Sequence, residues 1–180
     1  MLHLFLAPGF EEIEAIGTLD ILRRCGIEVM TVSVAGKRLV HGAHDIPVMA
    51  DAVFRRAIVE GSEGFILPGG MPGSYNLTLH DGLRKALVKQ HALGRLIAAI
   101  CAAPMVIGNL GILKGRRATC YPGFEDALRD ATVSDKAVEC DGHIITGKGP
   151  GAFIDFAFAI AARFKDTNEL ACLKSDMMLQ

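Results

Sequence analysis

Residues 95–110, which read RLIAAICAAPMVIGNL, constrain the fold of this chain more than any other segment. A short apolar run typical of a buried parallel strand leads directly to Cys101, and an apolar helix pattern follows. Pro104 lies where proline is common in the first turn of a helix. Small residues on both sides of Cys101 permit a sharp strand-to-helix turn, the geometry of a nucleophile elbow. The segment therefore predicts a strand–helix unit that presents one sulfur at the end of a strand.

The rest of the chain repeats this alternation of short apolar runs and helical patterns. Strands are predicted at residues 2–7, 28–34, 64–67, 96–100 and 117–120, with short β pieces at 38–53 and a hairpin over 137–146. Helices are predicted at residues 11–25, 79–91, 123–129, 151–164 and 166–180, and after Pro104. This order predicts an α/β fold, a three-layer sandwich in which a mainly parallel, flavodoxin-like sheet has helices on both faces. We expect one domain over residues 1–180.

Composition excludes several classes of protein. Hydrophobic residues make up 51% of the chain and charged residues 22%, which is typical of a folded globular protein. The formal net charge is −1 and Lys and Arg do not cluster, so neither nucleic acid nor a membrane surface is expected as a partner. Five cysteines without a CxxC pair, and no recognisable secretory leader, predict a soluble protein of the reducing cytoplasm.

Cys101 is the candidate nucleophile. Most free cysteines are inert small core residues, and we expect this of the other four. At the start of a helix, however, unpaired N–H groups and the helix dipole favour the thiolate. We therefore expect Cys101 to be accessible, with a lowered pKa. Cys120, which ends a predicted neighbouring strand, is an alternative resolving thiol.

Two further features lie at predicted strand ends. Glu14 falls on an inward-leaning stripe of its helix, where burial would keep its carboxyl protonated and able to act as a general acid. The alternative is that Glu14, like its acidic neighbours, only complements the helix dipole. Gly69 and Gly70 form either a simple turn or, with the N–H of Ala102, an oxyanion hole beside the sulfur.

Neither a cofactor nor a metal is expected. Residues 142–148 match the GxxxxGK phosphate-loop pattern, but Gly149 replaces the Ser or Thr that would bind magnesium. The loop at 147–151 is instead expected to be a turn or a wall of the pocket. His41 and His44 would need further ligands to hold a metal, and no Cys/His spacing indicates a zinc site.

Four motifs in order resemble the ThiJ/PfpI superfamily, in particular the branch of the Parkinsonism-associated deglycase and its bacterial relatives. Residues 7–14 read APGFEEIE, 67–70 read LPGG, 98–104 read AAICAAP and 149–151 read GPG. The resemblance implies a peroxide-sensitive Cys101, a protonated Glu14 as its partner, oxyanion-binding amides at Gly70 and Ala102, and Pro150 as a pocket wall. It also implies a homodimer, a role in oxidative stress, and cofactor-free glyoxalase or deglycase activity.

The chain departs from this family's pattern at two positions. The proteases of the family place His directly after the nucleophile, where this chain has Ala102, so a protease is not expected. Tyr121 lies near the second histidine position of the deglycase branch, and a phenol cannot act as a base near neutral pH as imidazole does. Proton transfer would then depend on Glu14.

Three hypotheses follow. The first is an enzyme that converts small α-oxoaldehydes or their adducts, with Cys101 as nucleophile, Glu14 as acid and base, and Gly70 and Ala102 holding the oxyanion. The second is an oxidative-stress sensor or chaperone in which peroxide oxidises Cys101 to the sulfinate without significant turnover. The third is a non-catalytic binding module, which predicts an unreactive Cys101.

Overall fold

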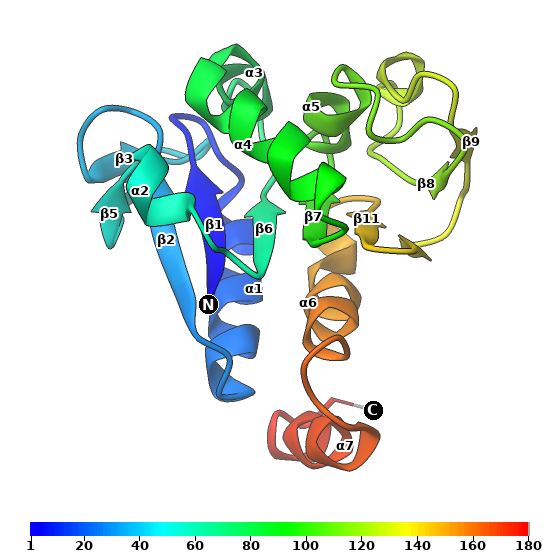
Figure 1. The fold of residues 1–180 in the computed structure, drawn as a ribbon. Helices are drawn as coiled ribbons and strands as arrows, with labels where there is room; N and C mark the ends of the chain where they lie inside the picture. Colours follow the sequence, from blue (N-terminus) through cyan, green and yellow to red (C-terminus); the bar gives the residue numbers. More distant parts are fainter. Residues whose placement is uncertain (180) are drawn as a thin grey trace.

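The computed structural model describes residues 1–179, so the last residue of the expected 1–180 domain, and of the helix expected at 166–180, lies outside it. Within residues 1–179, seven strands form one sheet in the order β10-β11-β7-β6-β1-β2-β5 (Figure 1). These strands are β1 (Leu2–Leu6), β2 (Val29–Ser33), β5 (Ala52–Val53), β6 (Gly64–Leu67), β7 (Leu96–Ile100), β10 (Val138–Asp141) and β11 (Ile144–Gly147). All neighbours pair in parallel except β10 and β11. The predicted mainly parallel α/β sheet is confirmed.

The central strands are apolar along their whole length because both faces of the sheet are covered. Every residue of β1 and β7 is buried. Their side chains alternate between two separate cores, since successive residues of a strand point to opposite faces. Leu4 and Ala98 belong to one core, whereas Phe5 and Ile97 belong to the other.

Helices cover the two faces. The core that contains Leu4 is closed by α1 (Glu12–Arg24) and α6 (Phe153–Ala161), and α7 (Thr167–Asp176) packs against α6. The other core is closed by α2 (Arg56–Val59), α3 (Gly73–Leu79), α4 (Asp81–Ala92) and α5 (Pro104–Gly108). Figure 1 shows α4 in front of the sheet and α1 behind it. Two single 3-10 turns, at Glu125–Ala127 and Pro150–Ala152, complete the helical elements of residues 1–179.

Three details differ from the prediction. The β pieces at 38–53 divide into a separate hairpin, β3 (Leu39–His41) with β4 (Pro47–Met49), and the edge strand β5 of the main sheet. Helices α2 and α3 were not predicted, because each is short and α3 follows a glycine-rich loop that conceals its pattern. The strand predicted at 117–120 is not in the main sheet. It is shortened to β8 (Arg117–Ala118) and pairs with β9 (Thr132–Val133).

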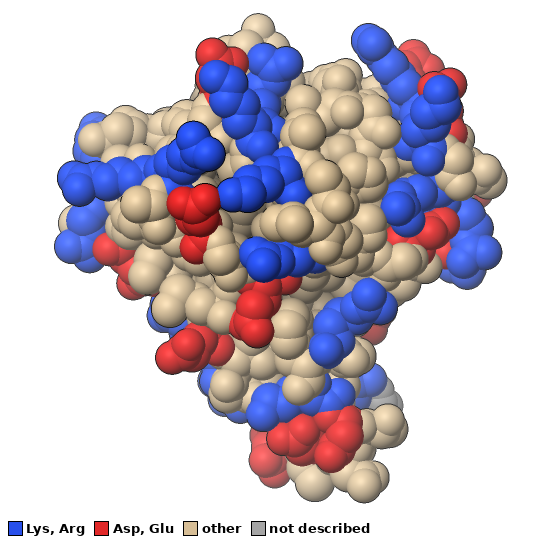
Figure 2. All heavy atoms as spheres, viewed as in Figure 1, with Lys and Arg blue, Asp and Glu red and all other residues tan. Residues whose placement is uncertain are grey.

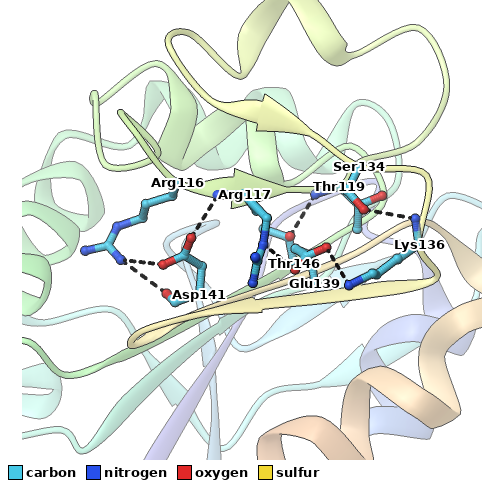
Figure 3. A network of polar contacts seen from close by, with 8 residues as sticks. All are labelled: Arg116, Arg117, Thr119, Ser134, Lys136, Glu139, Asp141 and Thr146. Carbon is cyan, nitrogen blue, oxygen red and sulfur yellow. Dashed lines mark hydrogen bonds and ion pairs between the residues drawn. The ribbon is translucent and has the colours of Figure 1, made fainter.

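A polar network explains where β8 lies. The antiparallel return of β10 already occupies the free edge of β11, so no main-chain position beside β11 is left for β8. Side chains hold β8 against this hairpin instead: the Arg117 N–H donates to Asp141 at 2.9 Å, and the Arg117 guanidinium donates to Glu139 at 3.0 Å (Figure 3). The Thr119 N–H donates to the Thr146 hydroxyl at 2.9 Å. This network keeps the segment after β8 close to the carboxyl end of β11.

The fold brings four loops to one edge of the sheet. Strands β11, β7, β6 and β1 are parallel neighbours, so their carboxyl ends lie side by side. Gly147, Cys101, Pro68 and Ala7 lie at or directly after these four ends. Ligand sites in open α/β sheets form at this edge.

No helix within residues 1–179 has both the length and the apolar character needed to cross a bilayer.

A close approach of α1 and α6 provides a test of the packing. A Cβ atom added at Gly17 would lie 2.5 Å from the Phe153 ring. We expect Gly17→Val to lower the free energy of unfolding by about 2 kcal/mol through overpacking, as measured by urea denaturation. The double variant with Phe153→Ala should be less destabilised than the sum of the two single variants, because the smaller side chain makes room. Strict additivity would contradict this account.

Candidate active site

Cys101 has a strained backbone that the surrounding strands hold in place. Its φ is +64°, in the left-handed region that residues other than glycine rarely adopt. The Cys101 N–H donates to the Gly147 carbonyl at the end of β11, at 2.9 Å. The Cys101 carbonyl accepts from the Tyr121 N–H, also at 2.9 Å. These two bonds fix the turn between β7 and α5, and the geometry is that of the predicted nucleophile elbow.

Two backbone amides face the sulfur. The backbone N–H groups of Gly70 and Ala102 favour the charged form of the Cys101 sulfur and so oppose the rise of its pKa. The predicted role of Gly69 needs correction, because its N–H does not point to the sulfur. It donates instead to Glu14 Oε2 at 2.7 Å. The turn at 69–70 therefore supplies one amide to the thiol and one to the carboxyl.

Gly69 also allows the thiol and the carboxyl to approach each other. A Cβ atom at this position would lie 2.5 Å from Cys101 Cβ and 2.7 Å from Glu14 Oε2. No real Cβ tolerates such distances, so any larger residue would displace one of the two groups. Gly70 has a φ of +86°, which favours glycine on backbone grounds.

Glu14 is buried at the centre of the site. Its side chain comes from the first turn of α1 and is 1% exposed. Oε2 accepts from Gly69, whereas Oε1 has no regular hydrogen-bond partner among residues 1–179. Burial raises the pKa of Glu14 to about 7, although the bonds with Gly69 and Cys101 oppose the shift. The carboxyl is thus poised to exchange a proton near neutral pH, which favours the functional alternative over simple dipole complementation.

The pKa expected for Cys101 is wrong in direction. Burial raises the pKa of the thiol to about 12, and the negative charge of Glu14 adds to this effect. The side chain is also nearly inaccessible, at 8% exposed. The predicted stabilisation by a helix dipole is small because α5 has only five residues, Pro104–Gly108. Loss of hydration therefore outweighs the dipole.

The thiol and the carboxyl act as one titrating pair. Because the pKa of Glu14 is about 7 and that of Cys101 about 12, the single proton that the pair holds above pH 7 lies on the sulfur, next to the Glu14 carboxylate. Proton transfer from sulfur to carboxylate forms a thiolate next to a neutral acid. In this form the carboxylate no longer repels the thiolate, and the amides of Gly70 and Ala102 stabilise the sulfur. The Glu14 carboxylate is thus placed to take up the thiol proton when the sulfur reacts.

Tyr121 and Pro150 line a shallow cavity, and neither Cys101 nor Glu14 is among its lining residues. The cavity has a volume of about 320 Å³, and Lys148 contributes to its wall. Tyr121 directly follows Cys120, and its N–H donates to the Cys101 carbonyl. The cavity therefore adjoins the elbow. The structure thus brings together Cys101, Glu14, Gly69, Gly70, Ala102, Tyr121 and Pro150. The predicted site residues all lie at the same edge of the sheet.

The side chains of Cys120 and Cys101 pack in different cores, although the two residues are joined through the bond between the Tyr121 N–H and the Cys101 carbonyl. Cys120 packs in the core on the face covered by α3 to α5, whereas Cys101 belongs to the core on the opposite face. Burial raises the pKa of Cys120 to about 11. The alternative of Cys120 as a resolving thiol gains no support from this arrangement.

The sequence did not reveal two contacts that shape the site. The Gly147 carbonyl that holds Cys101 belongs to a strand, and nothing in its residue type signals the bond. Glu12 accepts hydrogen bonds from the His44 N–H at 2.7 Å and the His44 ring at 2.8 Å, which fastens the loop between β3 and β4 to α1. Glu11, Glu12 and His44 could together offer ligand atoms to a metal. Both Glu12 oxygens, however, are already engaged by the loop.

Comparisons with known proteins agree on one family. The profile of the DJ-1/PfpI family matches residues 2–163. Drosophila melanogaster dj-1beta is 37% identical over 158 residues, which cover 87% of this chain and 84% of that protein. DJ-1 homolog B of Arabidopsis thaliana is 39% identical over 157 residues, or 86% of this chain, which spans only 36% of that protein's length. A protein of Pyrococcus abyssi that is named a deglycase is 30% identical over 147 residues, covering 81% of this chain and 87% of that protein.

Solved structures extend this agreement to the whole fold. A DJ-1 superfamily protein of Salmonella typhimurium, crystallised as a cysteine-to-alanine mutant, superposes with a TM-score of 0.94 at 37% identity. The superposition covers 99% of this chain and 98% of that one. The resemblance inferred from the four sequence motifs is thereby confirmed.

The shared proton predicts an unusual pH profile for Cys101. We expect its alkylation rate by iodoacetamide to rise with a midpoint near pH 7, following Glu14, and then to level off. In Glu14→Gln no carboxylate can accept the thiol proton, so the midpoint should move above the ordinary thiol value of about 8.5. Mass spectrometry of the alkylated peptide measures both profiles.

The exposed Cys172 provides an internal control in the same samples. Its profile should be identical in the two variants. If Glu14→Gln leaves the Cys101 midpoint unchanged, the two groups do not share a proton and the account fails.

Proposed function

The chain belongs to the DJ-1/PfpI family, and from this premise we propose that it is a cysteine-dependent, cofactor-free enzyme of the glyoxalase or deglycase type. Its substrates are small α-oxoaldehydes or their adducts with amines and thiols. The observation that carries the proposal is the buried Cys101–Glu14 pair, whose single proton is available near neutral pH.

The first step forms a covalent bond. Glu14 accepts the thiol proton, and the Cys101 thiolate attacks the aldehyde carbon. The carbonyl π electrons move to the oxygen, where the N–H groups of Gly70 and Ala102 stabilise the developing charge. Glu14 then returns its proton to this oxygen, which completes a hemithioacetal. Neither oxidant nor reductant is consumed.

The second step moves hydrogen between adjacent carbons. Glu14 removes the proton from the carbon bonded to sulfur, and the electron pair of this C–H bond forms a double bond to the neighbouring carbon, whose carbonyl oxygen takes up a proton to give an enediol. Glu14 then delivers a proton to the neighbouring carbon while the hydroxyl group on the sulfur-bearing carbon loses its proton and becomes a carbonyl, so the hemithioacetal becomes a thioester of a hydroxy acid with no net gain or loss of protons. Water then cleaves the thioester, releasing the hydroxy acid and restoring the Cys101 thiol. Each step needs an acid and a base of matched pKa, which Glu14 supplies.

The surroundings of the pair favour small substrates. Cys101 is nearly buried, and the adjoining cavity at Tyr121 and Pro150 is shallow. A folded peptide segment would not reach the sulfur. Ala102 also replaces the histidine that follows the nucleophile in proteases of the family, so peptide-bond hydrolysis is not part of the proposal.

A second candidate function rests on the same carboxyl. With a pKa raised to about 7, a protonated Glu14 can donate a hydrogen bond to a sulfinate oxygen on Cys101. Gly70 and Ala102 would supply two further donors. This arrangement favours peroxide oxidation of Cys101 by addition of two oxygens, and thus a role as an oxidative-stress sensor or chaperone.

Turnover of methylglyoxal tests the enzyme proposal. We expect Cys101→Ser to abolish lactate formation and Gly69→Ala to lower kcat/KM about 100-fold, because a misplacement near 1 Å can cost this much. Lys114→Ala is the control, since Lys114 is exposed and lies outside the lining of the cavity. Its kcat/KM should equal that of the unmodified protein.

The same assay separates the two candidate functions. Wild-type turnover in Cys101→Ser, or a negligible rate in the unmodified protein, would overturn the enzyme proposal. A mass gain of two oxygens on Cys101 at low peroxide, without aldehyde consumption, would establish the sensor.

We also propose that the protein is a homodimer of the reducing cytoplasm. Ile13 and Ile16 on α1 and Ile46 and Met49 on the adjoining hairpin are exposed apolar side chains. The bonds between Glu12 and the hairpin loop join these two elements into one surface. Cys140 and Cys172 are exposed free thiols, which persist in a reducing compartment.

Sedimentation velocity tests the dimer. We expect the unmodified protein to sediment as a dimer and Ile13→Glu as a monomer, because the variant would bury an unpaired charge at the interface. Val88→Glu, at an exposed apolar position on α4, is the control and should remain dimeric. A monomeric unmodified protein would refute the proposal.

A further inference from the structure

A second cavity lies on the opposite face of the sheet from α1 and α6. It is a groove between α2 and α4 with a volume of about 250 Å³. None of its lining residues belongs to the Cys101 site. The activity proposed above makes no use of it.

The floor of this groove is apolar. Phe65 from β6, Phe54 after β5 and Val59 from α2 form its base. The Phe54 ring lies edge-on to His80, with ring centroids 4.6 Å apart. It also packs so closely on α4 that a Cβ atom at Gly82 would lie 2.6 Å from it. The floor is therefore held by packing. Phe65 and Val59 are buried beneath it, and the partly exposed Phe54 ring and the exposed Leu93 provide the apolar surface that a ligand would meet.

The rim of the groove is basic. It carries four basic side chains, Arg56, Lys85, Lys89 and Arg95, against one acidic side chain, Glu60. The chain as a whole has a formal net charge of −1, so this local excess of positive charge does not reflect overall composition. Figure 2 shows Lys and Arg side chains gathered over the region of α2 and α4.

Two of the four cations are free to bind a ligand. Lys89 Nζ pairs with Glu60 at 2.8 Å, and Arg95 donates to the Ser62 carbonyl at 3.2 Å. Arg56 and Lys85 have no ion pair and no side-chain hydrogen bond among residues 1–179. Both are exposed at the mouth of the groove.

The lining selects one class of ligand. An anionic group would be attracted to Arg56 and Lys85, and an apolar body would cover the partly exposed Phe54 ring. A sugar or nucleotide is disfavoured because its hydroxyl groups would meet the apolar floor, and the buried Gln90 amide already donates to the Ser62 carbonyl at 3.1 Å.

We propose that the groove between α2 and α4 binds a small amphipathic carboxylate with an aryl or medium-length acyl body. The body lies against Phe54 and Leu93, and the carboxylate lies between Arg56 and Lys85. The groove is a binding site separate from Cys101, and no covalent step takes place in it.

Calorimetric titration with octanoate and 2-naphthoate tests this site on the full chain. We expect both to bind, whereas octanol, which lacks the charge, and acetate, which lacks the body, bind at least about tenfold more weakly. The double variant Arg56→Gln and Lys85→Gln should weaken octanoate binding about tenfold. Lys114→Gln, an exposed lysine outside the groove, should leave it unchanged.

Two further variants sharpen the test. Ala86→Phe, which fills the groove from α4, should abolish binding of both carboxylates, whereas Cys101→Ser should bind them as the unmodified protein does. The proposal is overturned if octanol binds as tightly as octanoate or if neither carboxylate binds. It is also overturned if the double variant behaves like Lys114→Gln, or if only an acidic peptide or anionic vesicles bind at the groove.

Discussion

The left-handed backbone at Cys101 is the constraint on which the site depends. A residue with a side chain adopts this conformation only when its surroundings hold it there, at a cost of about 1–3 kcal/mol. The Gly147 carbonyl from β11 and the Tyr121 N–H each bond the Cys101 backbone. These partners come from two different segments, the end of β11 and the chain after β8, and together they hold the strained turn. The sulfur is thereby fixed near the amides of Gly70 and Ala102.

Burial, rather than the helix dipole, determines the chemistry of this sulfur. A helix start stabilises a nearby negative charge by about 0.3–1 kcal/mol, and α5 is only five residues long. Raising the thiol pKa to about 12 corresponds to roughly 4 kcal/mol against the thiolate. A buried carboxyl that accepts the thiol proton lowers this cost. While the proton stays within the pair, the two groups together carry one buried negative charge and not two. Burial is the largest cause of both raised pKa values, and the charge of Glu14 raises that of Cys101 further.

The two faces of the sheet carry different features. The core under α1 and α6 includes Cys101, and α1 supplies Glu14, whereas the core under α2 to α5 forms the floor of the basic groove. Strand β6 contributes to both, since Phe65 lies in the groove and the loop after Leu67 provides Gly69 and Gly70. Successive residues of each strand point to opposite faces of the sheet, which makes this separation possible.

The sequence by itself determined the sheet and the identity of the site residues. Apolar runs such as residues 96–100 predict strands buried on both faces, and the order of strands and helices predicts that Cys101 and the loop with Gly69 and Gly70 meet at one edge. Glu14 is singled out by its place on a helix stripe, and Pro150 by the family resemblance. These features depend on local pattern and chain order. Only the tertiary structure decided that Gly69 serves Glu14 rather than the sulfur, that β8 leaves the main sheet, and that the thiol pKa is raised. Each of these depends on hydration and on contacts between residues distant along the chain, which neither residue type nor spacing encodes.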